Sequence, residues 1–299
     1  MLSTSALLAH TNDLNLIIRH VLAGLGHGMH AGRERGAGVE FSEYRAYAPG
    51  DEWRRIDWKL LARADRYYVR EAERDSHVAV WLWLDATASM AEPSRSGVAG
   101  LDKLWYARTI LACIAAIAQR QGDAFGLVIC NGERVQFTPA ARGPRQMQRV
   151  LAQLQRIEAG GVLPAGETLR ASMPFVRSPS LVFAASDFLD WPSSQADALM
   201  RLRRMRHDVR MLCLQTRAEC DASFALDTIW RDPENADGVF RFAADTVGAY
   251  RKNRDDHIGR MLAQCRHNDI PLLAACIEEP LPAVLRTWVR PWLRRGARA

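Results

Sequence analysis

Two short segments place oxygen-bearing side chains where a divalent cation could be held. Asp85, Thr87 and Ser89 occupy alternate positions of the segment DATASM, and Ser186 and Asp187 follow each other in the segment SDF. A carboxylate combined with hydroxyl groups suits a hard cation such as Mg²⁺, which takes oxygen ligands in octahedral geometry. Both segments are therefore candidate parts of a Mg²⁺ site, with Mn²⁺ or Ca²⁺ as alternatives. In the competing interpretation these side chains only cap or hydrogen-bond their own loops.

A doubly wound, mainly parallel sheet is the α/β architecture that could bring the two segments together. From residue 78 onward, apolar stretches of strand length alternate with amphipathic helical patterns, which is typical of this fold class. Ligands of such sheets bind beyond the carboxyl ends of the strands, and both segments directly follow a predicted strand. The predicted strands are 78–84, 124–130, 180–186, 208–214 and 270–277, and the predicted helices are 101–123, 143–158, a helix ending near 176, 193–206, 246–268 and 280–290.

Two turn signals predict antiparallel pairs within this pattern. Asn131-Gly132 predicts a hairpin turn into an antiparallel edge strand. A second hairpin is predicted as an insertion at about 226–243, with its turn in PENADG. We therefore expect one antiparallel strand at an edge of the main sheet and a separate two-stranded ribbon.

The organisation of the chain follows from the same patterns. Residues 1–31 predict a leading amphipathic helix, because apolar residues recur at helical spacing before a glycine-rich break. Residues 32–77 are rich in turns, charges and aromatics and predict a small β-rich module. The α/β domain is expected over 78–290. Pro291 is expected to end the last helix and to leave a basic tail at 291–299.

Composition and charge exclude several classes of protein. The 299 residues are 48% hydrophobic and 25% charged, with a formal net charge of +6, as in soluble globular proteins. The six cysteines form no CxxC pair, and no stretch approaches the length of a membrane span, so we expect a cytoplasmic protein without a membrane span. Neither a P-loop nor a GxGxxG motif is present, so no nucleotide site is predicted.

Longer motifs carry a resemblance to known families. The segment GVEFSEYRAYAPGDEWRRIDWKLLAR at 38–63 resembles the signature of the bacterial domain of unknown function 58 family. With LWLDATASM, QGDAFGLVI, SDF and EEPLPAVLR, the resemblance spans about 32–290. DATASM and SDF also resemble the Asp-x-Ser-x-Ser loop and the distal Asp of von Willebrand factor A domains, which form a metal-ion-dependent adhesion site (MIDAS).

The resemblance implies a von Willebrand factor A-like fold with a metal site made by Asp85, Thr87, Ser89 and Asp187. Such domains also place a Thr after a Gly-Gly pair in an intervening loop. Here Val162 follows Gly160-Gly161 and offers no oxygen. Thr168 is the nearest hydroxyl, and it either replaces the missing ligand or caps the next helix.

The upstream module offers a second candidate surface, for a protein partner. Its arginines and acidic residues could interlock as a structural lattice of ion pairs. Alternatively, its tryptophans and tyrosines could serve as the aromatic anchors that protein interfaces favour. The candidate residues are Arg45, Tyr47, Asp51, Trp53, Arg54, Asp57, Trp58 and Arg63.

These observations lead to one functional hypothesis and two alternatives. The hypothesis is a non-enzymatic adaptor whose bound Mg²⁺ recruits a carboxylate of a protein client. The family resemblance implies partnership with a MoxR-type AAA+ ATPase in maturation of protein complexes or in stress responses. One alternative is a Mg²⁺-dependent hydrolase or nuclease with Asp51 or Asp57 as the base, although clustered carboxylates for two-metal chemistry are missing. The other is nucleic-acid binding, which rests only on the modest positive charge, so neither DNA nor RNA is expected as a partner.

Overall fold

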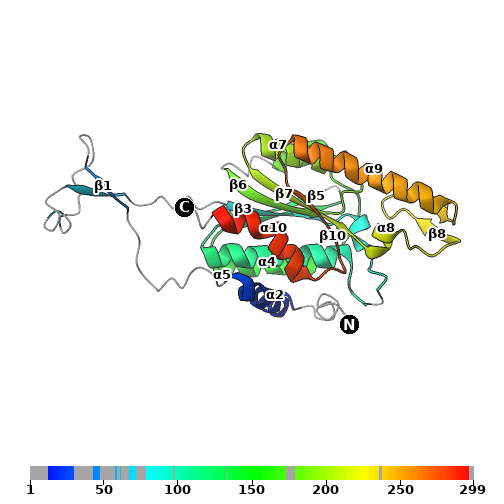
Figure 1. Ribbon diagram of the computed structural model, residues 1–299, viewed down its shortest axis with the longest axis horizontal. Helices are drawn as coiled ribbons and strands as arrows, with labels where there is room; N and C mark the ends of the chain where they lie inside the picture. Colours follow the sequence, from blue (N-terminus) through cyan, green and yellow to red (C-terminus); the bar gives the residue numbers. More distant parts are fainter. Residues whose placement is uncertain are drawn as a thin grey trace. The chain divides into compact units, whose positions relative to one another are not determined.

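The computed structural model describes residues 13–29, 43–47, 58, 61, 67–71, 79–96, 98–132, 134–172, 179–235 and 238–295 (Figure 1). The chain divides into two compact units. The larger comprises Met1–Gly28 and Val78–Ala299, and the smaller comprises Met29–His77. The predicted site residues of DATASM and SDF belong to the larger unit.

A six-stranded sheet forms the centre of the larger unit. Its strands lie in the order β10-β7-β6-β3-β4-β5, and every neighbouring pair is parallel except β4 and β5. The doubly wound, mainly parallel sheet predicted from the sequence is thus confirmed, together with its antiparallel edge strand after Asn131-Gly132. The strands are β3 (Ala79–Asp85), β4 (Phe125–Asn131), β5 (Arg134–Ala141), β6 (Ser180–Ser186), β7 (Asp208–Gln215) and β10 (Leu272–Cys276).

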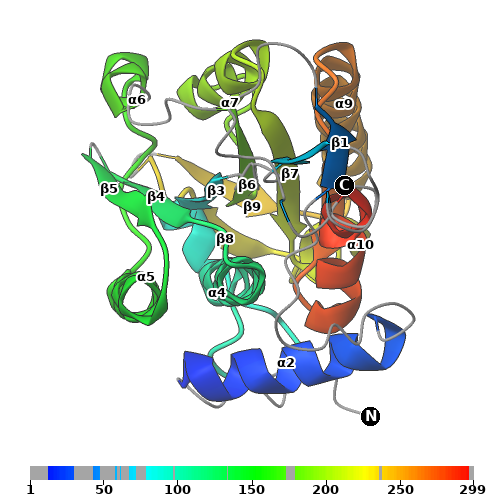
Figure 2. The same cartoon turned by 90° about the vertical axis from the view of Figure 1, so that its left-hand side faces the viewer.

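Helices cover both faces of this sheet (Figures 1 and 2). One face carries α4 (Lys103–Gln121), α5 (Pro144–Arg156) and α10 (Leu281–Arg295), with α2 (Leu14–Met29) on their outer side. The other face carries α6 (Gly166–Ser172), α7 (Ser194–Arg204) and α9 (Thr246–His267). Shorter elements are the 3₁₀ helix η2 (Ala88–Ala91), α8 (Arg217–Asp221) and the hairpin of β8 (Thr228–Arg231) and β9 (Val239–Phe242).

The central strand β3 shows why the sequence folds this way. Successive side chains of a strand point to opposite faces, so a strand between two helix layers must be apolar at every position. Leu82 and Leu84 belong to the core on the α4 side, whereas Trp81 and Trp83 belong to the core on the α7 side. Gly126 of β4 lies against the ring of Trp81, and a Cβ there would come within 2.4 Å of that ring.

The amphipathic pattern of residues 1–31 corresponds to α2. One side of this helix is buried in the same core as α4 and α10. Leu16 points away from that core and is 53% exposed. The buried residues of α2 are Leu14, Ile17, Ile18, Val21 and Leu22.

The last helix extends further than the sequence predicts. It was expected to end before Pro291, but α10 continues to Arg295. Proline removes one backbone donor, which costs a hydrogen bond within the helix. Packing outweighs this loss, because Trp292 in the next position lies against the core and its ring stands 5.6 Å from that of Phe183. Within the predicted basic tail, residues 291–295 are therefore helical.

The smaller unit contains the short strands expected for this segment. β1 (Glu43–Ala46) pairs antiparallel with β2 (Tyr68–Glu71). The pairing continues into a hydrogen bond of 2.9 Å from the backbone N–H of Tyr47 to the carbonyl oxygen of Tyr67. The rings of these two tyrosines stand 6.2 Å apart.

The burial of α2 leads to a prediction for stability. Ile17 is fully buried, so Ile17→Ala is expected to lower the free energy of unfolding by about 2–4 kcal/mol through lost burial and a cavity. Leu16→Ala removes an exposed side chain of the same helix and should change this free energy by roughly 0.5 kcal/mol or less. Urea denaturation of the two variants measures the difference. Equal losses would show that α2 does not unfold together with the sheet.

Candidate functional site

The carboxyl edge of the sheet brings the two predicted segments together. From β3 the chain runs to β4 on one side, while β6 pairs with β3 on the other side. Such a reversal of strand order opens a crevice beyond the strand ends, where doubly wound folds bind their ligands. Asp85 ends β3 and Asp187 directly follows β6, so both carboxylates lie at the carboxyl edge of the sheet.

Asp85 is held by a dense set of donors. Its side chain is 2% exposed; its Oδ1 accepts the backbone N–H of Thr87 at 2.9 Å, and its Oδ2 accepts the hydroxyl of Ser186 at 2.5 Å. Gln195 contacts both Asp85 and Trp83 when its side-chain amide is oriented so that each polar atom has a partner. Its nitrogen then donates to Oδ2 of Asp85 at 3.1 Å, and its oxygen accepts from Nε1 of Trp83 at 3.2 Å. Burial, together with the negative charge of Asp187, raises the pKa of Asp85 to about 7.

The two hydroxyls of the DATASM loop also lie close together. The side-chain oxygens of Thr87 and Ser89 stand 3.2 Å apart, and both residues are buried. The backbone N–H of Ser89 points to Glu234 of the β8–β9 hairpin, whose Oε1 lies 3.4 Å away. An acidic side chain of the inserted hairpin therefore reaches this loop, a contact that the sequence did not predict.

The Gly-Gly loop lies beside the same segment. Ala88 donates its backbone N–H to the carbonyl of Gly161 at 2.9 Å, and Gly160 donates to the carbonyl of Ala86 at the same distance. Gly161 has a φ of +68°, and a Cβ there would lie 2.5 Å from Cα of Gly132. Glycine is therefore required for the loop to pack against the β4–β5 turn. Val162, the next residue, is 42% exposed.

Lys103 brings an unpredicted positive charge to the site. It is the first residue of α4 and follows Asp102, whose side chain caps this helix by accepting the N–H of Trp105 at 2.6 Å. The Lys103 side chain is 1% exposed, and its ammonium donates to Oδ2 of Asp187 at 3.0 Å and to Oε1 of Glu219 at 2.7 Å. Burial lowers the pKa of Lys103, but these two carboxylates raise it by more, so the net shift is upward.

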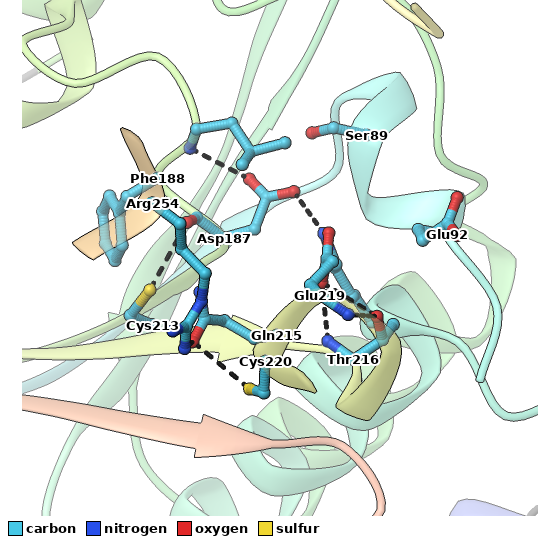
Figure 3. Close-up of polar contacts among 12 residues, drawn as sticks. Ser89, Glu92, Asp187, Phe188, Cys213, Gln215, Thr216, Glu219, Cys220 and Arg254 are labelled. Atoms are coloured by element: carbon cyan, nitrogen blue, oxygen red, sulfur yellow. Dashed lines mark hydrogen bonds and ion pairs between the residues drawn. The ribbon is translucent and has the colours of Figure 1, made fainter. Parts of the chain in front are cut away.

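The short helix α8 fixes Glu219 in place (Figure 3). The carboxylate of Glu219 accepts the backbone N–H of Thr216 at 2.6 Å, while the Thr216 hydroxyl accepts the backbone N–H of Glu219 at 3.2 Å. This reciprocal pair is a capping box. Glu219 therefore presents its other oxygen to Lys103 from a fixed position.

A cavity of about 230 Å³ opens next to the ammonium of Lys103 and its two carboxylate partners. Lys103, Asp187 and Glu219 line one part of it, and Tyr250 and His257 of α9 line another. The cavity lies beyond the end of β7, whose Leu214 and Gln215 also contribute to its wall. The site thus combines a hollow with charged groups that are already paired.

These contacts allow the predicted metal site to be compared with the chemistry that Mg²⁺ requires. The hydroxyls of Thr87 and Ser89 are close enough to share one ion, but Val162 supplies no third hydroxyl. The carboxylate of Asp187 is already paired with the ammonium of Lys103. This donor set does not fit Mg²⁺ well, and magnesium binding stays a prediction.

The other candidate residues are Thr168 and those of the smaller unit. Thr168 lies in α6 and is half-buried. In the smaller unit Arg45 belongs to β1, Tyr47 follows it, and Trp58 is 58% exposed. The candidates that lie outside the described residues are Asp51, Trp53, Arg54, Asp57 and Arg63.

Fold and site together define a class of protein: an α/β domain with a doubly wound, mainly parallel sheet and a polar site at its carboxyl edge. The chain aligns with the SpRpn10 VWA domain at 8% identity (TM-score 0.41, covering 70% of this chain and 94% of that one). It also aligns with the conserved hypothetical protein BatB of Bacteroides thetaiotaomicron at 13% identity (TM-score 0.41, 71% and 99%). These distant alignments carry no information about function.

The chain belongs to the family described as protein of unknown function DUF58, whose model matches residues 43–248. It is 30% identical over 244 residues to the uncharacterized protein Rv1480 of Mycobacterium tuberculosis and to the uncharacterized protein Mb1516 of Mycobacterium bovis. Each alignment covers 79% of this chain and 73% of the relative. Membership of the family predicted from residues 38–63 is therefore confirmed. Among the helices that the structure describes, none has the length and apolar character needed to cross a membrane.

The raised pKa of Asp85 predicts a pH dependence of stability. Between its ordinary pKa of 3.8 and about 7, the folded protein keeps a proton that the unfolded chain has released. Stability contributed by the neutral carboxyl is therefore lost as pH rises through this window. At pH values above the window, Asp85→Asn is expected to be more stable than the unmodified protein by about 1–3 kcal/mol. Urea denaturation across the window tests this, with the exposed Asp190→Asn as control; parallel curves for Asp85→Asn and the unmodified protein would contradict it.

Proposed function

We propose that this protein is a non-enzymatic adaptor that binds a protein partner at the carboxyl edge of its sheet. The partner in this proposal is a MoxR-type AAA+ ATPase, and the setting is maturation of protein complexes or the stress response in the cytoplasm. Support for the ATPase comes from the family resemblance alone. Support for the binding surface comes from the geometry of the site.

The observation that carries the proposal is that the charged groups of the site are already engaged with one another. Asp85 accepts hydrogen bonds from its own loop and from Ser186, and Asp187 is paired with Lys103. A catalytic carboxylate needs access to the proton that it transfers. These groups instead stiffen the strand ends, which favours a binding role over chemistry.

Two exposed apolar side chains stand in the loops of this edge. Val162 belongs to the Gly-Gly loop that is hydrogen-bonded to the DATASM loop, and it is 42% exposed. Leu189 comes two residues after Asp187 and is 54% exposed. Apolar side chains beside fixed polar groups are features that protein partners recognise. We therefore assign Leu189 and Val162 to the contact with the partner.

The proposal assigns no role to magnesium in this contact, because the donor set departs from what the ion requires. The proposal keeps a carboxylate of the client, which would compete with Glu234 for the backbone N–H of Ser89. Neither alternative gains support from the described residues. Asp51 and Asp57, the bases considered for a hydrolase, lie outside them, and the carboxylates at the strand ends are paired.

Variants at the two exposed positions test the proposal. Leu189→Arg and Val162→Arg are each expected to weaken binding of the purified ATPase by roughly tenfold or more, because a solvated charge replaces an apolar contact. Met205→Arg is the matched control. Met205 is 45% exposed and lies between α7 and the start of β7, at the opposite edge of the sheet.

Surface plasmon resonance with the immobilised adaptor measures all three affinities. Equal affinities for the three variants and the unmodified protein would exclude this edge as the contact. Failure of the unmodified protein to bind the ATPase would instead refute the partner.

A further inference from the structure

Lys103 occupies a position where a lysine is unfavourable unless it has a specific role. The amino end of a helix carries a partial positive charge, which favours acidic residues and opposes cations in the first turn. Lys103 is nevertheless the first residue of α4, and its side chain is 1% exposed. Helix α4 is otherwise one of the most buried elements of the core. Neither helix formation nor the hydrophobic effect explains a lysine here.

The partners of Lys103 supply the explanation. A charge withdrawn from water is tolerated only when opposite charges and hydrogen bonds compensate for the lost hydration. The ammonium bridges two carboxylates from separate elements: Asp187, after β6, and Glu219, in α8. Asp187 is one of the residues that the resemblance assigns to a metal.

We propose that the ammonium group of Lys103 is the resident cation of this site, in place of the divalent ion of a metal-ion-dependent adhesion site. It holds the strand ends together by attracting Asp187 and Glu219, as a bound metal would. The carboxyl edge is then permanently assembled and requires no Mg²⁺.

Two further features agree with this replacement. A divalent ion that used Asp187 would share one carboxylate with the ammonium at close range, and the two cations would repel each other in a site shielded from water. The loop that would supply a third hydroxyl carries Val162 instead. Compared with a metal-ion-dependent adhesion site, this site has gained the positive charge of Lys103 and lacks one oxygen ligand.

The inference goes beyond the proposed function, because it concerns the protein alone and needs no partner for its test. Isothermal titration calorimetry of the chelator-treated protein with Mg²⁺ and Mn²⁺ is expected to show no saturable binding at millimolar concentrations. The thermal midpoint is expected to be the same in chelator and in Mg²⁺. Saturable binding that disappears in Ser89→Ala would overturn the proposal.

Three lysine variants test the role of the charge. Lys103→Met keeps the length of the side chain but leaves two carboxylates without their cation, so its thermal midpoint is expected to fall sharply. Lys103→Arg keeps the charge and should recover part of that loss. Lys252→Met removes an exposed charge from α9 and should change little. Equal midpoints for Lys103→Met and Lys252→Met would refute the proposal, and if Lys103→Met does not fold, the metal titration decides.

A second inference rests on a pair of cysteines beyond this site. The sulfur atoms of Cys220 in α8 and Cys276 at the end of β10 stand 2.9 Å apart, and both residues are partly exposed. The hydrogen bond from Cys276 lowers the pKa of Cys220, burial opposes this effect, and the charge of Arg254 adds to it. A thiolate with a second thiol in contact is the arrangement of redox-active pairs.

We infer that Cys220 and Cys276 form a reversible disulfide when hydrogen peroxide is present. The Cys220 thiolate attacks one peroxide oxygen, the O–O bond breaks, and a sulfenic acid and hydroxide form. Cys276 then attacks the sulfenic sulfur, the S–S bond forms and water leaves, so two electrons pass from the thiols to the peroxide. The bond would tie α8, which carries Glu219, to the edge strand β10.

Mass spectrometry after peroxide treatment and alkylation tests this inference. The expected product is one disulfide between Cys220 and Cys276 that dithiothreitol reverses, with the buried Cys113, Cys130, Cys213 and Cys265 protected from oxidation. Cys276→Ser is expected to leave Cys220 as a sulfenic acid that dimedone traps. Recovery of both Cys220 and Cys276 as reduced thiols under these conditions would overturn the inference.

Discussion

The buried ion pair of Lys103 and Asp187 is the interaction on which the carboxyl edge depends. Its two side chains are 1% and 3% exposed, so each charge has lost most of its hydration and must be compensated by the protein. Glu219 completes the group from α8. The three residues belong to elements that are far apart in sequence but meet at one point. Since none of these charges is tolerated alone, the start of α4, the end of β6 and the start of α8 must close together.

Most of the fold could be predicted because it depends on local patterns. The inner strands β3, β4 and β6 are almost continuously apolar, since both of their faces are buried, and the turn from β4 into the edge strand β5 is marked by Asn131-Gly132. Prediction failed where packing overrides a local rule. Pro291 disfavours a helix, yet α10 passes through it because Trp292 packs onto Phe183. The short helix α8 was also missed, since a capping box around so few residues produces no hydrophobic period.

The site was predictable only in the parts that one strand end supplies. Asp85, Thr87 and Ser89 lie together because a single loop carries them, and parallel pairing of β3 with β6 brings Asp187 to the same edge. Lys103, Glu219 and Glu234 enter the site through tertiary contacts, which spacing along the chain does not encode. One signal was nevertheless present. A lysine directly after the capping Asp102 contradicts the helix dipole, and such a local contradiction often marks a functional or strained position.

The distribution of polarity at this edge explains how one fold can keep its shape while its function changes. In a metal site the ion organises the loops, and its loss disorganises them. When a lysine supplies the positive charge, the loops are ordered as soon as the chain folds, because the cation is a side chain of α4. In the proposed function the partner contacts the exposed Leu189 and Val162, and neither side chain takes part in the ion pairs of Lys103. An edge assembled in this way is suited to constitutive protein recognition, because its geometry does not depend on the concentration of a diffusible ion.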